Sequence, residues 1–163
     1  MEQALNTAGQ PVKRGTMAHD HDVAMLLAES AVQRRDGAAI RSHAARLEEL
    51  ALRDGHRLYL AIAQRAWGVA HRLAGELAEA GERLNQALEQ FAEMEARWQV
   101  GRTFYELGEL AVARSDLAGA RDCFSKALSA FEAAGAGPDA EQALQSMAEQ
   151  GWLPSAPVDP SKN

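Results

Sequence analysis

The first side chains in the chain with clear chemical potential are two histidines and two aspartates, in the run His19-Asp20-His21-Asp22. Imidazole and carboxylate groups are common metal ligands, so this run is a candidate metal site. On a helix, however, a spacing of two residues places the two histidines on opposite sides, and only an extended segment would bring them together. We therefore expect a polar helix start here, with Asp20 or Asp22 as the N-cap and without a metal.

The remaining histidines and the single cysteine form no recognisable catalytic arrangement. His43, His56 and His71 are far apart, and His71 lies on a helix stripe where a packed, hydrogen-bonded ring is expected. Cys123 has no evident base beside it, so we expect a half-buried, small apolar residue. The sequence has no glycine-rich phosphate loop, paired-carboxylate site or nucleophile motif. We expect neither enzyme activity nor a cofactor.

The elements that position all these residues are helices, most clearly between Gly101 and Gly135. The first half of this stretch has small and large apolar residues at spacings of three and four: Phe104, Leu107, Gly108, Ala111 and Val112. Ser115 and Asp116 then interrupt the pattern with side chains that prefer turns and N-caps. The second half has the same spacing in Leu117, Ala120, Phe124, Ala127, Leu128 and Phe131. The pattern predicts two antiparallel amphipathic helices.

Five more segments have helical spacing and are separated by turns. They are Asp22 to Arg35, Ala38 to Arg53, Leu58 to Ala74, Leu77 to Met94, and Asp139 to Gln150. We expect residues 1–20 to be a flexible N-terminal segment and residues 21–151 to form one helical domain. The proline-rich residues 152–163 are expected to be a disordered tail, with Trp152 a candidate anchor for the last helix.

The helical segments repeat with a period of 40 residues. Gly68 and Gly108 lie 40 residues apart, and six further pairs share this offset: Leu77 with Leu117, Ala80 with Ala120, Leu84 with Phe124, Ala87 with Ala127, Leu88 with Leu128, and Phe91 with Phe131. A repeat of this length indicates stacked helix pairs. The spacing predicts three pairs and a last, solitary helix whose outer face is polar and which caps the stack.

The repeat unit resembles a tetratricopeptide repeat (TPR). The family pattern of a large residue, Leu-Gly, a smaller hydrophobe, an alanine and an aromatic is matched by Phe104, Leu107-Gly108, Ala111, Ala120 and Phe124. The 40-residue period is similar to that of the helical sensor domains of bacterial activators of the maltose-regulator type. The resemblance implies an all-α, right-handed α-solenoid, and a non-catalytic module that binds a peptide or helix of a partner protein.

In such a stack the first helix of each pair lines a concave groove. The side chains expected there are Met25, Glu29, Val32, Arg65, Val69, Arg72, Arg102, Tyr105, Glu109 and Val112. Arginine and tyrosine are frequent interface anchors and suit a partner with acidic character. The alternative is a solvated face with intrahelical pairs such as Arg102 with Glu106. The lysines and asparagine that some family members use to hold a C-terminal carboxylate are replaced by Met25, Glu29 and Ala66.

The composition of the chain argues against two classes of protein, those that bind nucleic acid directly and those that span a membrane. The net charge of −6 argues against direct nucleic-acid binding, and no apolar run is long enough to cross a membrane. The N-terminus lacks a secretion-signal pattern, so a cytoplasmic location is expected.

A ligand-sensing or regulatory domain that controls a separate effector is the alternative function. Self-association into a homo-oligomer is a third candidate, with Met25, Leu26 and Val32 as the expected seam.

Overall fold

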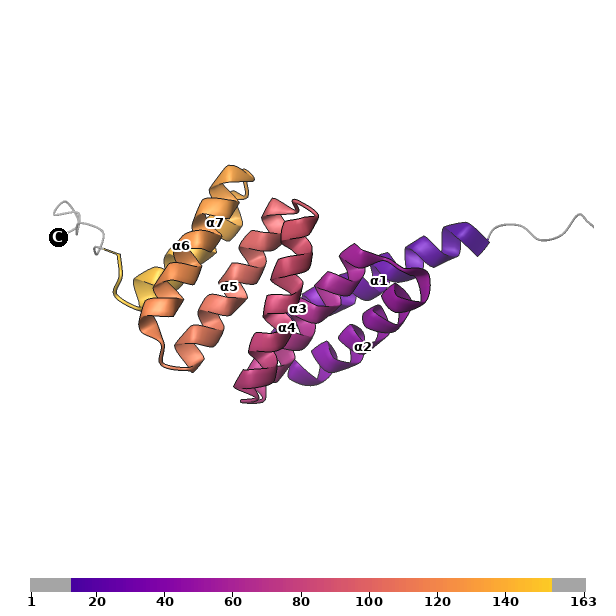
Figure 1. Cartoon of the computed structure of the whole chain (residues 1–163), viewed down its shortest axis with the longest axis horizontal. Coiled ribbons are helices and arrows are strands. Elements are labelled where there is room, and N and C mark those ends of the chain that lie inside the picture. The colour runs from indigo at the N-terminus through magenta and orange to yellow at the C-terminus, as the bar shows by residue number, and fades with distance from the viewer. Residues whose placement is uncertain (1–12, 154–163) are drawn as a thin grey trace, which may run out of the picture.

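The computed structural model describes residues 13–153, with side chains from His19 onward (Figure 1). This part of the chain forms seven α-helices and no strands, as the sequence predicts. The helices are α1 (Lys13–Gln33), α2 (Gly37–Asp54), α3 (Arg57–Leu73), α4 (Leu77–Glu93), α5 (Arg97–Ala113), α6 (Leu117–Ala133) and α7 (Gly137–Glu149). None of them is both long and apolar enough to cross a membrane.

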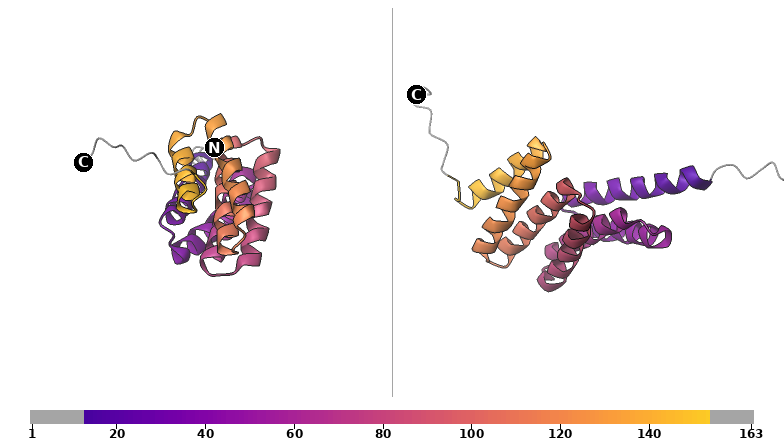
Figure 2. Two further views of the ribbon diagram at one scale, coloured as in Figure 1. Left: turned by 90° about the vertical axis from the view of Figure 1, so that its left-hand side faces the viewer. Right: turned by 45° about the horizontal axis from the view of Figure 1, so that its top comes forward.

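The two ends of the helical region differ from the prediction. Helix α1 begins at Lys13, so Asp20 and Asp22 lie inside it and the predicted N-cap at either residue is wrong. Its early part projects beyond the other helices (Figures 1 and 2). At the other end Trp152 and Leu153, which the sequence assigns to the tail, pack against the core of α5 to α7. Residues 1–12 and 154–163 lie outside the described part of the chain.

Successive helices form hairpins that stand side by side in an elongated row, with α1 and α2 at one end and α7 at the other (Figure 1). Each helix packs against the next along the chain, and α1 also contacts α3, while α3 contacts α5. The odd-numbered helices α1, α3 and α5 therefore share one side of the row. Asp116, predicted to start a helix, caps α6 by accepting a hydrogen bond from the Gly119 amide at 2.9 Å.

Glycine lets the two helices of a pair approach closely at Gly68 and Gly108, which are equivalent positions in the 40-residue repeat. A Cβ atom added to Gly108 would lie 2.8 Å from the ring of Phe124, and one added to Gly68 would lie 2.5 Å from Cγ of Leu84. The two contacts occupy equivalent places in successive 40-residue units. In each unit, a glycine on the first helix thus makes room for a large side chain on the second.

The turns between helices recur every 20 residues. Each contains one residue with a left-handed φ: Arg35, Gly55, Gly75, Glu95, Ser115 and Gly135. At each such turn the helix ends with a backbone hydrogen bond reaching back across the turn, such as that from the Asp116 amide to the Ala111 carbonyl at 2.9 Å. Three of the six positions are not glycine, although L-residues disfavour this conformation.

Candidate functional site

Seven charged residues on the shared side of α1, α3 and α5 form what we call the arginine–glutamate network. Its members are Glu29, Arg35, Arg65, Arg72, Arg102, Glu106 and Glu109. All but Arg35 lie within these three helices, and Arg35 occupies the left-handed position of the turn after α1. Because each glutamate is approached by at least one arginine of another helix, the network ties the three helices together.

The first half of the network surrounds Glu29. Its Oε1 accepts a hydrogen bond from Arg65 Nη2 at 2.7 Å, and its Oε2 lies 2.9 Å from Arg102 Nη1. Arg65 is 2% exposed; its guanidinium also donates to the Gln99 carbonyl at 3.3 Å and lies 5.1 Å from the ring centre of Phe91. Arg65 is thus held by other groups of this chain and has little surface left for a partner.

These surroundings shift the pKa values of both Glu29 and Arg65. Burial by itself raises the pKa of the Glu29 carboxyl, but attraction to Arg65 and Arg102 outweighs burial, and the pKa ends below its ordinary value. Burial lowers the pKa of Arg65, and the attraction of Glu29 only partly offsets that effect. Glu29 is therefore a carboxylate at neutral pH and holds two cations on neighbouring helices.

The second half of the network surrounds Glu106, whose side chain is 5% exposed. Arg35 Nη1 donates to both of its oxygens, at 3.1 and 3.3 Å, and Arg72 Nη2 donates to Oε2 at 3.0 Å. The intrahelical pair of Arg102 with Glu106, named in the alternative interpretation, is not formed, since Arg102 approaches Glu29 while Glu106 accepts from Arg35 and Arg72. The prediction missed Arg35 and the role of Glu106 because 71 residues separate this pair.

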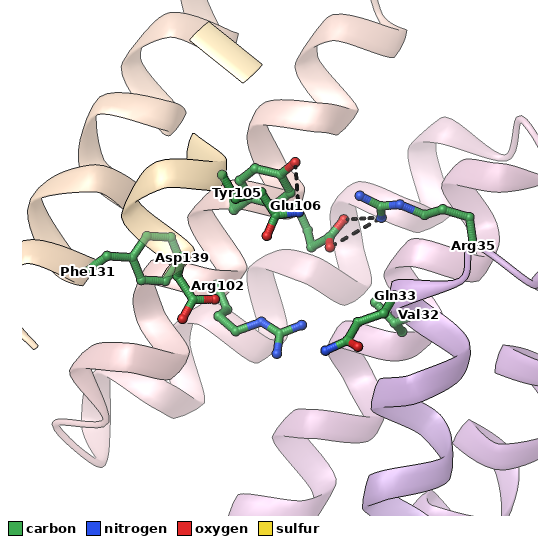
Figure 3. A pocket seen from close by; sticks show the side chains of 9 residues that line it. Val32, Gln33, Arg35, Arg102, Tyr105, Glu106, Phe131 and Asp139 are labelled. Carbon is green, nitrogen blue, oxygen red and sulfur yellow. Dashed lines mark hydrogen bonds and ion pairs between the residues drawn. The ribbon is translucent and has the colours of Figure 1, made fainter. Parts of the chain in front are cut away.

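A pocket of about 290 Å³ opens beside this half of the network (Figure 3). It lies between the end of α1, the middle of α5 and the facing ends of α6 and α7. Its lining is mainly polar and consists of Val32, Gln33, Arg35, Arg102, Tyr105, Glu106, Phe131, Asp139 and Gln142. Arg35, whose side chain is 33% exposed, is its most accessible arginine. Among the described residues only Nη1 of Arg35 has hydrogen-bond partners, so its Nη2 and Nε make no hydrogen bond within this part of the chain.

Tyr105 joins α5 to α7 at one wall of the pocket. Its hydroxyl lies 3.0 Å from Ser146 Oγ and accepts a hydrogen bond from Gln142 Nε2 at 3.4 Å. Its ring packs 5.5 Å from that of Phe124, and burial raises the pKa of the phenol. Tyr105, predicted to anchor a partner, is therefore a neutral residue that is largely buried and positioned by α7.

The other predicted groove residues are divided between surface and core. Glu109 is 28% exposed, 3.9 Å from Arg72 Nη1, and burial raises the pKa of its carboxyl. Val69 is fully buried, so its assignment to a groove surface is wrong. Met25 and Val112 are half-buried against the core. In the expected self-association seam, Val32 is buried as well, and only Leu26 is well exposed.

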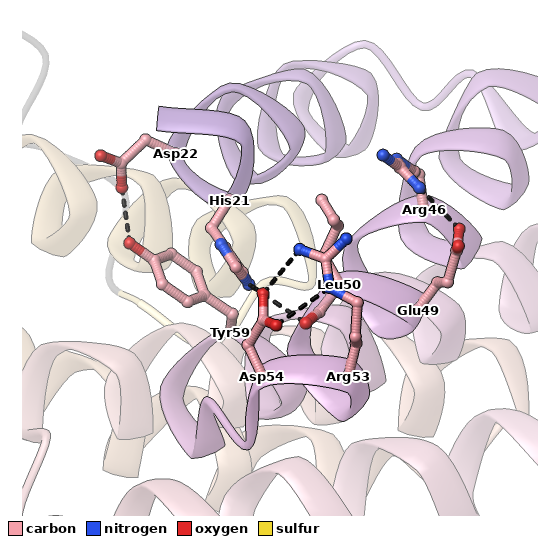
Figure 4. Close-up of polar contacts among 8 residues, drawn as sticks. All are labelled: His21, Asp22, Arg46, Glu49, Leu50, Arg53, Asp54 and Tyr59. Atoms are coloured by element: carbon pink, nitrogen blue, oxygen red, sulfur yellow. Dashed lines mark hydrogen bonds and ion pairs between the residues drawn. The ribbon is translucent and has the colours of Figure 1, made fainter. Parts of the chain in front are cut away.

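The histidine–aspartate run near the N-terminus has a structural role (Figure 4). His21 is 1% exposed, and its Nε2 lies 3.1 Å from the Leu50 carbonyl oxygen and 3.3 Å from Asp54 Oδ2. Tyr59 donates to Asp22 at 2.5 Å. His19 is exposed, on the other side of the helix, as the spacing predicts. The described side chains contain no group of three or more His, Cys, Asp or Glu residues that could hold a metal.

The half-buried Cys123 agrees with its predicted character, and burial raises the pKa of its thiol. A protonated thiol is a poor nucleophile.

Comparison of the chain with protein-family models, curated proteins and solved structures found no match. The resemblance to tetratricopeptide repeats therefore depends on the repeat pattern in the sequence, and the function must be inferred from the geometry of the chain itself.

Proposed function

We propose that the chain is a non-catalytic binding module that holds a peptide or helix of a partner protein against α1, α3 and α5. The module is a right-handed α-solenoid of the tetratricopeptide-repeat type, with α7 as its cap. The 40-residue repeat, the sequential hairpins and the equivalent contacts of Gly68 and Gly108 support this assignment. The exposed Glu141, Gln142, Gln145 and Glu149 on α7 suit a terminal helix that faces water.

The observation that carries the binding proposal is the pocket beside Arg35. Arg35 has two guanidinium nitrogens without hydrogen-bond partners among the described residues, and Arg102 and the Gln142 amide line the same pocket. A carboxylate side chain on a partner segment can accept hydrogen bonds from Arg35 while Glu106 keeps its bond from Arg72. The favoured ligand is thus a segment with an acidic side chain beside apolar ones, because Val32 and Phe131 complete the pocket.

The proposed contact set differs from the set predicted from the sequence. Arg65 and Arg72 have side chains that are 2% and 10% exposed and are engaged by Glu29 and Glu106. They support the face and do not contact the ligand. Arg35, Arg102 and Gln142 are the residues that we assign to ligand contact.

Selection from a displayed peptide library, followed by measurement of Kd, tests this proposal. The Arg35→Gln change should raise the Kd of the selected peptides by about tenfold or more, since a charged hydrogen bond is lost. Arg121→Gln on α6 is the matched control, because Arg121 is exposed and lies away from the pocket. Selected peptides that bind the Arg35→Gln chain as tightly as the original would contradict the proposal, as would failure to select any peptide.

A ligand-sensing domain is the second candidate, and one feature of the pocket favours it. Two arginines and two carboxylates, those of Glu106 and Asp139, line a volume of about 290 Å³. That size and mixed charge suit a small zwitterion such as an amino acid. A rise in Tm with one such compound, abolished by Arg35→Gln and accompanied by no peptide binding, would favour this candidate over the first.

A further inference from the structure

Helix α1 exposes an apolar patch that no other described helix matches. Val23, Leu26 and Leu27 lie within five residues and are 42%, 63% and 45% exposed. The other exposed large hydrophobic residues in the described chain are spread singly or far apart over α2, α3, α5, α6 and α7. Because these three residues follow helical spacing, they occupy a single side of α1, beside the side that buries Ala24, Ala28 and Ala31.

The patch lies at the end of the row opposite to α7 (Figure 1). At the other end, the outer side of α7 consists mainly of glutamate and glutamine. Terminal helices of stacked repeats need a polar outer face to remain monomeric, and on α1 the exposed polar residues are interrupted by Val23, Leu26 and Leu27. This difference between the two ends indicates that another surface covers the apolar side of α1.

A shallow groove of about 230 Å³ runs beside the patch, between α1 and α2. Val23 and Leu27 form its α1 side, and His43 and Leu50 belong to its α2 side. Leu26, the most exposed residue of the patch, lies next to this groove on the same helix. The surface therefore combines a projecting leucine with a groove of a size that accepts one.

Two charges lie symmetrically about the centre of the patch. Asp20 precedes Leu27 by seven residues and Arg34 follows it by seven. Arg34 is the first residue after α1, and its amide still donates to the Ser30 carbonyl at 3.1 Å, as in a further helical turn. Because seven residues are close to two helical turns, Asp20 and Arg34 both lie on the side of Leu27. Both side chains are exposed, and neither forms an ion pair among the described residues.

We propose that a second copy of this chain packs its α1 antiparallel against α1 of the first, about a twofold axis at Leu27. The axis places Asp20 of each copy opposite Arg34 of the other, so two ion pairs form together. It also places Leu26 of each copy over the groove between α1 and α2 of the other. The occupant is a second copy because the charges of this single surface complement themselves, which a twofold interface requires.

The contact is small, so the dimer should depend on protein concentration. Sedimentation velocity of the full chain should show a mass that rises with concentration from 17.6 kDa toward twice that value, 35.2 kDa. Leu26→Glu should leave a monomer with an unchanged helical circular-dichroism spectrum, since Leu26 is 63% exposed and contributes little to the fold. If the unmodified chain is a monomer at every concentration, the proposal is overturned. This holds also if residues 1–12 cover the patch.

Charge reversal tests the register of the two helices. Asp20→Arg alone and Arg34→Asp alone should each weaken the dimer by about tenfold or more, because each places like charges together twice. An equimolar mixture of the two variants should form heterodimers, since every facing pair is then again of opposite charge. The double variant should dimerise as the original does. A dimer that persists with Leu26→Glu, or single variants that the mixture fails to rescue, would overturn the arrangement.

Discussion

At the scale of single residues, the main finding is that most arginines predicted to meet a partner are engaged within the chain. Arg65 and Arg72 join glutamates on α1 and α5, and their guanidinium groups are nearly buried. A buried cation without a counter-ion is costly, so these pairs cannot be broken one member at a time without loss of stability. Arg35 differs because it is partly exposed and is held through only one nitrogen.

Glu106→Gln should lower the free energy of unfolding by about 2 to 4 kcal/mol. The change removes the negative charge that faces Arg72, whose side chain is 10% exposed, and Arg35. Urea unfolding followed by circular dichroism at neutral pH measures the loss. A change of less than about 0.5 kcal/mol would mean that solvent screens this cluster as it screens surface pairs.

Glu109→Gln, one turn further along the same helix, is the matched control and should act in the opposite direction. Burial raises the pKa of Glu109, so folding favours its neutral form. The resulting contribution to stability is present below the ordinary pKa of 4.5 and is lost as the pH rises through the raised value. The variant should therefore unfold at a higher urea concentration at neutral pH, and its advantage should vanish below pH 4.5. Destabilisation at neutral pH would contradict this sign.

At the scale of elements, the left-handed residue in each turn sets where a helix ends. Gly55, Gly75 and Gly135 adopt this conformation without a Cβ atom, whereas Arg35, Glu95 and Ser115 adopt it against their preference. At Arg35, the side chain gains an ion pair with Glu106 in return. A strained residue that carries a pocket-lining charge is typical of functional sites. Ser115 is exposed and has no comparable gain.

Ser115→Gly should stabilise the protein by about 0.5 to 1 kcal/mol, because relief of the left-handed strain exceeds the added entropy of the unfolded chain. The turn's hydrogen bond from the residue 115 amide to the Val112 carbonyl, 2.9 Å long, is retained. Gly135→Ala is the reciprocal control, since its φ is 67° and an added Cβ would meet nothing within 4 Å. It should destabilise by about 1 kcal/mol. Thermal unfolding measures the change in Tm of each variant. Changes of the same sign in the two variants would contradict the explanation.

At the scale of the whole molecule, α7 closes the C-terminal end of the row. Ala143 and Met147 are buried in the core cluster that contains Phe124 and Phe131, and Ser146 holds the Tyr105 hydroxyl. Trp152 adds a ring contact with Phe124 at 6.1 Å, in agreement with its predicted role as an anchor. The C-terminal side of α5 and α6 is thus covered by a short helix and the two residues that pack after it.

Ending the chain at Ala136 should expose this apolar side and lower stability more than any single substitution above. Loss of Met147 and Trp152 from the core should lower the urea midpoint and create binding of a hydrophobic dye. The remaining helices should stay folded at low temperature, because each helix packs mainly on its neighbours. An unchanged midpoint without dye binding would show that α7 is dispensable.

The sequence alone determined the seven helices of the described chain, most of their bounds and the 40-residue repeat. These depend on local spacing, as with Gly68 and Gly108, which make equivalent close contacts in two successive units. It also placed Asp116 correctly as a helix cap, since capping involves only neighbouring residues. The start of α1 was predicted too late, at Asp22, and the burial of His21 by Leu50 and Asp54 of another helix was missed, because such contacts are not visible in local spacing.

Only the tertiary structure decided which charges meet. Arg35 and Glu106 lie 71 residues apart, and Glu29 joins Arg65 and Arg102 from two other helices. Helical periodicity states which side of a helix a residue occupies, but not which residue on another helix lies opposite or how much water stays between them. For that reason the sequence could identify a face of arginines and glutamates, and only the packing of three helices showed that most of them bind one another and that Arg35 remains accessible.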